Sequence, residues 1–370
     1  MSRRIKLVGL TLGDPFDPAS RSGVNYKIFS KFCEQFELLD VFDLDIGGVW
    51  KLILAAKTLS FDRRTWGNKL HQNPLAFNIR TDMAGKKLEG IEYKFDLIYQ
   101  DGAMFMPGWI PKAPYVSYHD SNVILSAKGK PYSQGAHYTK RNLDRTVQQE
   151  KMVYQNASLV FSMSDWLKRS LIEDFGIPEE KIITVYAGTN LEVEDFEKCY
   201  DGRTILFVGR NFERKGGKTL LEAFKLVRKE IKDATLITIG PTLNVDLEGV
   251  QTLGPIKDKN ELTKFFQQAS IFALPSFYEP FGIVFAEAFA FKTPCIGTNI
   301  CAMPEIIEDG KGGFVVPPGD YKTLSEKIIE LLKNEELLRQ MGEYGFKKAK
   351  TTFNWDIVVD KMLLHCSRIV

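Results

Sequence analysis

The sequence predicts an α/β protein of two doubly wound, Rossmann-like domains in series. Its 370 residues exceed what one hydrophobic core usually supports, about 250–300 residues. Apolar runs of strand length alternate with amphipathic segments of helix length, which is the pattern of a parallel sheet covered on both faces. A polar segment without periodicity, 192–203, separates the two series, and we predict that it is the linker.

The first domain is predicted to span 1–191. It opens with a strand, RIKLVGLTL, then a loop, GDPFDPASRSG, and an amphipathic helix from about Gly23 to Phe36. A second helix, DWLKRSLIEDFG, has Ser164 as its expected N-cap and ends at Gly176. The other expected strands are FELLDVFDL, FDLIYQDG, APYVSYHD, SLVFSMS and EKIITVYAG.

The second domain, 204–350, alternates more regularly. Strand TILFVGR precedes helix GKTLLEAFKLVRKEI, and strand ATLITIG precedes helix NELTKFFQQA. Strand IFALPS then leads into a helix that starts near Gly282, and strand PCIGTN follows. Ligands of such sheets bind beyond the carboxyl ends of the strands, so the segments that follow the strands are the places to search for a site.

Composition excludes several classes of protein. The net charge of +2 argues against a dedicated nucleic-acid binder. No uncharged apolar run reaches the roughly 18 residues of a membrane span, and MSRRIKLVGL does not have the form of a cleavable signal. The five cysteines are scattered and lack CxxC spacing, so we expect reduced, buried thiols in a cytoplasmic protein, with neither a disulfide framework nor a zinc site.

Two carboxylates flank the predicted helix start in SFYEPFGIVFAEAFA. Pro280 disfavours helical geometry at Glu279, which places that residue in the loop, and Glu287 lies about one and a half turns into the helix. The free amides of Phe281, Gly282 and Ile283 favour an anion. These groups suit a sugar held beside a phosphate. The alternative is one carboxylate that complements the helix dipole and one exposed glutamate.

A basic loop, VGRNFERKGGKT, follows the first strand of the second domain. It is not a P-loop, because Phe212 stands where that pattern requires glycine. Arg210 at the strand end and Lys215 five residues later can both face one site, and such a pair suits a diphosphate. Alternatively, both are solvated loop cations.

The first domain offers fewer candidates. His119 follows the strand in YVSYHDSN, where it is either catalytic or structural. Gly23 either lets the backbone approach a ligand or simply permits the turn. The first loop lacks GxGxxG, which argues against a nicotinamide site. The sequence DLD at Asp43–Asp45 matches a metal-binding pattern only superficially and lies in a strand-like run, so we interpret it as structural.

Taken together, these motifs resemble the GT-B glycosyltransferases, specifically the retaining enzymes of family four. The resemblance rests on Glu279 and Glu287 in an E-x7-E pattern within PSFYEPFG, on TPCIGTN, PEII and GGFVVPPGD, and on VGRNFERKGG and SDWLKRSLIEDFGIPEEKIITVYAGTN. It covers nearly the whole length and is weakest at 40–110. It implies two domains facing a cleft, and a C-terminal helix, 354–370, that packs back on the first domain.

The resemblance also implies roles for the candidate residues. Glu279 would hold hydroxyls of the donor sugar, and Glu287 would hold the nucleotide ribose. Arg210 and Lys215 would grip the diphosphate, with the amides of 281–283 on sugar and phosphate. His119 would face the reacting centre, and Gly23 would lie beside the donor phosphates. The implied reaction is sugar transfer with retention of anomeric configuration from a nucleotide-sugar donor to a carbohydrate or lipid-linked acceptor, with neither metal nor cofactor.

Three other functions remain open. A GT-B nucleotide-sugar epimerase would convert the donor without an acceptor. A retaining glycosidase would need paired carboxylates about 5 Å apart and would act without a nucleotide. A nucleotide-sugar sensor would bind without turnover.

The segment 49–71 mixes apolar and aromatic residues with lysine and arginine. It is interpreted as a core helix with a solvated face. The alternative is a peripheral contact with an anionic membrane surface, or with an anionic acceptor.

Overall fold

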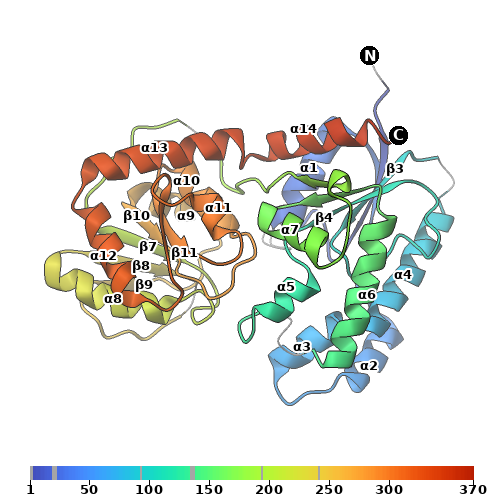
Figure 1. The fold of residues 1–370 in the computed structure, drawn as a ribbon, viewed down its shortest axis with the longest axis horizontal. Helices are drawn as coiled ribbons and strands as arrows, with labels where there is room; N and C mark the ends of the chain where they lie inside the picture. Colours follow the sequence, from blue (N-terminus) through green and yellow to red (C-terminus); the bar gives the residue numbers. More distant parts are fainter. Residues whose placement is uncertain (1–2, 19–22, 92–93, 134–137, 193–194, 241) are drawn as a thin grey trace. The chain divides into compact units, whose positions relative to one another are not determined.

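The computed structural model describes residues 3–18, 23–91, 94–133, 138–192, 195–240 and 242–370. The chain divides into two compact units, one of residues 1–186 and 355–370 and the other of residues 187–354 (Figure 1). Each unit carries a six-stranded sheet whose described strand pairs are all parallel, as the alternating pattern predicts.

The sheet of the first unit has the strand order β2-β1-β3-β4-β5-β6. Its strands are β1 (Lys6–Thr11), β2 (Glu37–Asp43), β3 (Leu97–Asp101), β4 (Tyr115–His119), β5 (Leu159–Ser162) and β6 (Ile182–Thr184). Its helices are α1 (Val24–Gln35), α2 (Gly48–Lys57), α3 (Arg63–His71), α4 (Pro74–Glu89), α5 (Val123–Lys128), α6 (Lys140–Asn156), α7 (Asp165–Glu173) and α14 (Trp355–Cys366), and a 3₁₀ turn covers Glu179–Lys181.

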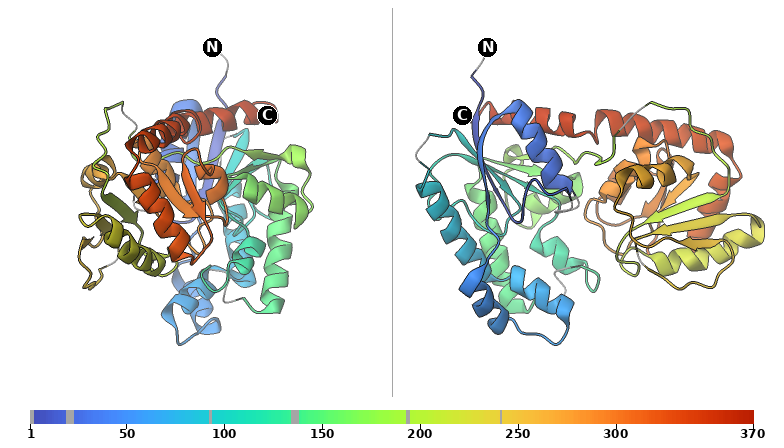
Figure 2. Two further views of the ribbon diagram at one scale, coloured as in Figure 1. Left: turned by 60° about the vertical axis from the view of Figure 1, so that its left-hand side comes forward. Right: turned by 180° about the vertical axis from the view of Figure 1, so that it is seen from behind.

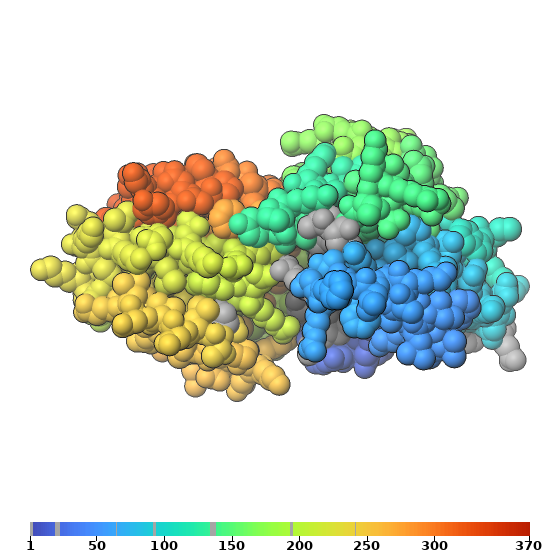
Figure 3. All heavy atoms as spheres, turned by 90° about the horizontal axis from the view of Figure 1, so that it is seen from below, coloured from blue at the N-terminus to red at the C-terminus, as the bar shows by residue number. Residues whose placement is uncertain are grey.

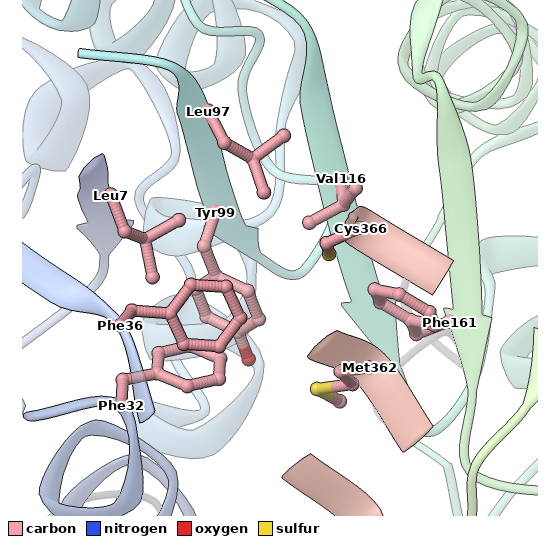
Figure 4. Close-up of a pocket in the computed structure, with 9 residues that line it drawn as sticks. All are labelled: Leu7, Phe32, Phe36, Leu97, Tyr99, Val116, Phe161, Met362 and Cys366. Atoms are coloured by element: carbon pink, nitrogen blue, oxygen red, sulfur yellow. The ribbon is translucent and has the colours of Figure 1, made fainter. Parts of the chain in front are cut away.

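Side chains alternate between the two faces of this sheet, as strand geometry requires. Val8, Ile98 and Val160 belong to the core cluster that also contains residues of α4 and α6. On the other face, Figure 4 shows an apolar pocket under α1 and α14. It is lined by Leu7, Leu97, Tyr99, Val116 and Phe161 of the sheet, Phe32 and Phe36 at the end of α1, and Met362 and Cys366 of α14.

The C-terminal helix α14 packs on the first unit beside α1, and the right-hand view in Figure 2 shows the two helices adjacent. Lys31 of α1 forms an ion pair with Asp356 at 2.7 Å, and Gln35 donates to Asp360 at 2.8 Å. These contacts place the last helix with the first unit although it follows the second in sequence.

The sheet of the second unit has the order β12-β11-β10-β7-β8-β9. Its strands are β7 (Thr204–Val208), β8 (Thr235–Ile239), β9 (Val250–Thr252), β10 (Ile271–Ala273), β11 (Cys295–Thr298) and β12 (Gly313–Val316). Its helices are α8 (Gly217–Glu230), α9 (Lys259–Gln268), α10 (Ile283–Ala290), α11 (Met303–Ile307), α12 (Tyr321–Leu332) and α13 (Glu335–Thr351). Phe272 of β10 contacts Phe266 of α9 and Phe285 of α10 edge-on or tilted, which binds both helices to the sheet.

Ser164 is confirmed as the N-cap of α7, because its side chain accepts a hydrogen bond from the Leu167 amide. The prediction of a linker at 192–203 is wrong for its second half, and 193–194 lie outside the described residues. Lys198 and Tyr200 are buried, and Lys198 Nζ donates to the Phe266 carbonyl and to Thr293 Oγ1, each at 2.8 Å. A polar sequence without periodicity concealed these anchors, because their partners are distant in the chain.

All five cysteines are free thiols. Cys295 and Cys366 are buried, as expected, but Cys33 and Cys199 are exposed, which corrects the expectation for those two. Of the helices in the described ranges, none has the length and apolar character needed to cross a membrane.

Candidate functional site

The candidate site of the second unit forms where two loops meet. β7 and β10 are hydrogen-bonded parallel neighbours, with Ile205 opposite Ile271. The carboxyl ends of neighbouring parallel strands lie at the same edge of the sheet, so the loops that follow them come together. The loop after β7 carries Lys215 and the loop after β10 carries Glu279, which are 64 residues apart in sequence.

Arg214 joins the two loops through its backbone and its side chain. Its carbonyl accepts a hydrogen bond from the Phe277 amide at 2.8 Å, and its guanidinium donates to the Tyr278 carbonyl. This bracing holds the residues before Glu279 against the basic loop.

Glu279 accepts from two cations on one carboxylate oxygen. Lys215 Nζ lies 2.6 Å from Oε2 and an Arg214 nitrogen lies 3.2 Å from it. Only 13% of the side chain of either Glu279 or Lys215 is exposed. Burial by itself would raise the pKa of Glu279, but Lys215 and Arg214 reverse this and hold that pKa below its ordinary value. The carboxylate is therefore ionised at neutral pH.

The structure changes the predicted pairing of Arg210 with Lys215. Arg210 is exposed and forms no ion pair or hydrogen bond with any residue in the described ranges, whereas Lys215 is engaged with Glu279. Arg214 is the cation that shares Glu279, and the sequence analysis missed it. The available signal was its position next to Lys215, in the same basic loop.

Two glycines at the ends of this loop leave room for bulky side chains. A Cβ at Gly209 would lie 2.2 Å from Lys215 Cδ, and one at Gly217 would lie 2.2 Å from the Phe212 ring. Gly209 therefore leaves space for the lysine side chain, and Gly217 leaves space for Phe212, the residue that rules out a P-loop.

Helix α10 starts as predicted, with Gly282 as its N-cap. Gly282 has φ 79°, a left-handed conformation that glycine adopts without strain. Among the described residues, none accepts a hydrogen bond from the amides of Phe281, Gly282 or Ile283. Three free donors at a helix N-terminus form a place for an anion beside the Lys215–Glu279 pair.

Glu287 is partly exposed and forms no hydrogen bond or ion pair with any described residue. Burial raises its pKa to about 7, against the opposing charges of Lys259 and Lys215. An acceptor without a partner remains available to a ligand hydroxyl.

Gly23 lies in the first unit, where it is the N-cap of α1 with φ 82°. Asn25, in the first turn of α1, is buried and holds that turn against the sheet. It donates to Thr11 Oγ1 at 2.7 Å and to Asp101 at 3.2 Å. Gly23 thus stands at the carboxyl ends of β1 and β3.

His119 ends β4 and is buried. Its ring meets the ring of Tyr154 edge-on, with centroids 5.1 Å apart. Tyr154 donates to Glu150 at 3.2 Å, and the same Glu150 oxygen accepts from the Val123 amide at 2.9 Å. Burial raises the pKa of Glu150 to about 8. Glu150 and Tyr154, which the sequence analysis missed, brace the turn that follows His119.

The predicted residues therefore form two groups, each within one unit. Arg210, Lys215, Glu279, the amides of 281–283 and Glu287 belong to the second unit, and Gly23 and His119 belong to the first.

Asp43 is engaged in local structure. Its Oδ1 accepts from the amides of Gly13 and Asp45, each at 2.8 Å. A structural role for DLD fits these bonds. The absence of a metal from the reaction stays a prediction.

Comparison with known proteins identifies the domain that carries this cluster. Residues 191–348 match the family model Glycosyl transferases group 1, and this range contains the whole Lys215–Glu279 cluster and α10. The second unit, 187–354, therefore carries a glycosyl transferases group 1 domain.

The chain is similar to two proteins that are named glycosyltransferases. It is 31% identical over 211 residues to the uncharacterized glycosyltransferase MJ1178 of Methanocaldococcus jannaschii, covering 56% of this chain and 58% of the relative. It is 28% identical over 236 residues to the capsular polysaccharide biosynthesis glycosyltransferase CapM of Staphylococcus aureus, covering 58% of this chain and 62% of the relative. The chain thus spans about three fifths of the length of each.

A solved structure matches the chain along its length. HepE of Anabaena, in complex with UDP and glucose, superposes with a TM-score of 0.68 at 18% identity, covering 98% of this chain and all of that one. At this identity the likeness establishes the fold, which is GT-B as predicted.

Proposed function

We propose that this glycosyltransferase moves a sugar, with retention of configuration and without a metal ion, from a nucleoside diphosphate sugar to a hydroxyl of a carbohydrate or lipid-linked acceptor. The observation that carries the proposal is the meeting of Lys215 and Arg214 at Glu279, beside the free amides at the start of α10. Lys215 and Arg214 against one ionised carboxylate leave a net charge of +1, to which Arg210 at the end of β7 would add a third cation, and this excess of positive charge suits a diphosphate.

The proposed role of the cations is to stabilise the leaving group. Negative charge grows on the diphosphate as its bond to the sugar breaks, and fixed positive charge near that group lowers the barrier. An ammonium has three N–H donors, so Lys215 keeps donors for a phosphate oxygen while it holds Glu279. The α10 amides supply further donors on the same side.

Glu279 and Glu287 are proposed to recognise the donor by accepting hydrogen bonds. Glu279 would accept from hydroxyls of the transferred sugar, and its ionised state strengthens those bonds. Glu287, which has no partner among the described residues, would accept from the ribose.

The proton needs no separate enzymic base in this proposal. The acceptor oxygen bonds to the anomeric carbon on the face that the phosphate leaves, and the electron pair of the broken bond stays on the phosphate. A phosphate oxygen takes the acceptor proton. His119 is proposed to face the reacting centre from the first unit, and Gly23 is proposed to lie beside the donor phosphates.

The relatives' names support the substrate classes. HepE is described with UDP and glucose, and CapM is assigned to capsular polysaccharide biosynthesis. We therefore propose a nucleoside diphosphate hexose as donor and a growing saccharide as the first acceptor class to test.

Metal independence is tested by a product assay with and without excess EDTA, on wild type and Lys215→Ala. Wild type should keep its activity in EDTA, because the cations already stabilise the leaving group. Lys215→Ala should raise the barrier by roughly 2–4 kcal/mol, the range for loss of one preorganised donor. NMR of the product should show the anomeric configuration of the donor.

Each part of the proposal has a result that would contradict it. Loss of activity in EDTA with rescue by magnesium or manganese would contradict the metal-free proposal. Full activity of Lys215→Ala would contradict the role of that lysine, and an inverted product would contradict retention.

We also propose a cytoplasmic location. All five thiols are free, and the exposed Cys33 and Cys199 are of the kind that persists in a reducing compartment. Fractionation of cells that produce the native chain should recover it in the cytoplasmic fraction or on the inner face of the membrane. Recovery from the extracellular medium would contradict this.

A further inference from the structure

The surface formed by α2, α3 and their connection carries unusually exposed apolar side chains, and we call residues 48–71 the α2–α3 surface. Val49, Leu52 and Leu59 are each 70% exposed or more, Trp50 is 52% exposed, and Phe61 is fully exposed. In Figure 3 this segment is the blue region that faces the viewer. Single exposed apolar residues are common, but five within 13 residues of one segment are a concentration that calls for a partner.

Most of the apolar side chains of α2 are not buried in the protein. Of the ten residues of α2, GVWKLILAAK, only Leu54 is buried, in a small cluster with Ala76 and Ile79. The interpretation of 49–71 as a core helix is therefore wrong for most of the segment. An amphipathic helix normally turns its apolar face inward, whereas α2 leaves Val49, Trp50 and Leu52 in water.

Three cations of the same surface have no ion-pair partner among the described residues. Lys51, Lys57 and Arg63 are exposed, and none forms an ion pair with any residue in the described ranges. The acid among them, Asp62, accepts from the Thr65 amide at 2.6 Å as the N-cap of α3. By contrast, several exposed lysines of the second unit form ion pairs, for example Lys218 with Glu213, Lys225 with Glu222 and Lys333 with Glu230.

The α2–α3 surface is held in place by specific bonds. Trp66 Nε1 donates to the Ala55 carbonyl at 3.1 Å, which ties α3 to α2. Asn73 donates to the Lys69 carbonyl at the end of α3 and also caps α4. The buried Arg80 of α4 donates to the His71 carbonyl at 2.7 Å. The exposed side chains therefore stand on helices fixed to the first unit.

We propose that the α2–α3 surface docks on an anionic lipid bilayer. Trp50, Leu52 and Phe61 would enter the boundary between headgroups and acyl chains, and the exposed cations would lie at the level of the lipid phosphates. Helices that lie at a membrane interface typically combine aromatic and aliphatic side chains with Lys and Arg that have no ion-pair partner in the protein. Protein interfaces are instead depleted in lysine, which makes a protein partner a poorer fit. This inference does not depend on the transfer reaction.

The test is co-sedimentation of the full chain with phosphatidylcholine vesicles that contain or lack phosphatidylglycerol. Wild type should bind the anionic vesicles, and less so at high salt. Lys51→Gln with Lys57→Gln should weaken binding about 25-fold, since each cation near such a surface contributes about fivefold. Leu52→Asp with Phe61→Asp should abolish binding.

A matched control is Leu253→Asp, which replaces an exposed apolar residue of the second unit. It should bind vesicles as wild type does. The replaced side chains of the α2–α3 surface touch little of the core, so all variants should keep the circular dichroism spectrum and melting temperature of wild type. Vesicles with brominated acyl chains should quench wild-type tryptophan fluorescence more than that of Trp50→Phe.

The proposal is overturned if wild type binds neither vesicle, or if Leu52→Asp with Phe61→Asp binds as tightly as wild type. It is also overturned if sedimentation analysis shows that the patch instead holds two copies of the chain together. Transfer to a water-soluble acceptor is a separate readout, so failure of vesicle binding and failure of the proposed function can be told apart.

Discussion

At the scale of single residues, Glu279 and Glu287 are chemically different acids. Two cations hold Glu279 ionised, whereas Glu287 has no described partner and its pKa is raised to about 7. The E-x7-E spacing alone gives no reason to distinguish the two carboxyl groups. Their distinct surroundings imply that removing one or the other has different consequences.

Glu279→Ala should lower turnover more than nucleotide affinity, because its proposed contacts are to the transferred sugar. Glu287→Ala should instead weaken binding of the bare nucleoside diphosphate, because its proposed contact is to the ribose. Isothermal titration with the diphosphate, together with steady-state kinetics, measures both. Equal diphosphate affinity of wild type and Glu287→Ala would refute the ribose contact.

The raised pKa of Glu287 also predicts a pH dependence of stability. The folded chain favours the protonated carboxyl group of Glu287 over the ionised one. The contribution of this group to the free energy of unfolding is therefore complete below its ordinary pKa of 4.5 and is lost as pH rises toward about 7. Glu287→Gln cannot ionise and should lack this loss. Its free energy of unfolding should therefore rise relative to that of wild type between pH 5 and pH 8, in urea titrations without ligand. Parallel profiles for the two proteins would contradict the shifted pKa.

At the scale of elements, the start of α10 depends on one backbone conformation. Gly282 has φ 79°, and a Cβ there would lie 2.9 Å from the Phe285 ring and 3.0 Å from Glu279 Cγ. The same residue thus shapes the helix start and leaves room for the carboxylate.

Gly282→Ala should destabilise the fold by more than the roughly 1–2 kcal/mol of a left-handed alanine, and should also weaken diphosphate binding. Gly310→Ala is the matched control, because Gly310 has φ 77° with no atom within 4 Å of the added Cβ. Gly310→Ala should lose only the stability that a left-handed alanine costs, and it should keep the nucleotide affinity of wild type. Melting curves and titration of both variants make the comparison. Identical behaviour would mean that the contacts with Phe285 and Glu279 are of no consequence.

At the scale of the whole molecule, the two units differ in continuity. The second unit is one uninterrupted segment, 187–354, with its own sheet and core, whereas the first requires the distant segment 355–370. Apart from Gly23, the groups that we propose to bind the donor belong to the continuous unit.

A fragment of residues 187–354 should therefore fold alone and bind a nucleoside diphosphate. Ligand at about 100 times its dissociation constant should add about 2.7 kcal/mol to the unfolding free energy of the fragment, as of the full chain. Thermal shift with UDP, GDP and ADP measures this. A folded fragment that no diphosphate stabilises, with the same result for the full chain, would contradict the assignment of the donor site.

Local sequence determined much of this protein. Strands β1–β8, β10 and β11 and helices α1 and α7–α10 follow from hydrophobic period, and Ser164 follows from its capping chemistry. The placement of Lys215 and Glu279 after neighbouring strands could also be anticipated, because parallel sheets gather their loops at one edge.

Only the tertiary structure decided which groups touch. It gave Glu279 the second cation Arg214, left Arg210 in solvent, and placed Glu150 and Tyr154 behind His119. It buried Lys198 in a segment that resembled a linker, and exposed Trp50 and Phe61 in a segment that resembled a core helix. The physical reason is that burial and pairing depend on partners dozens of residues away, whereas periodicity and capping depend only on near neighbours in the chain.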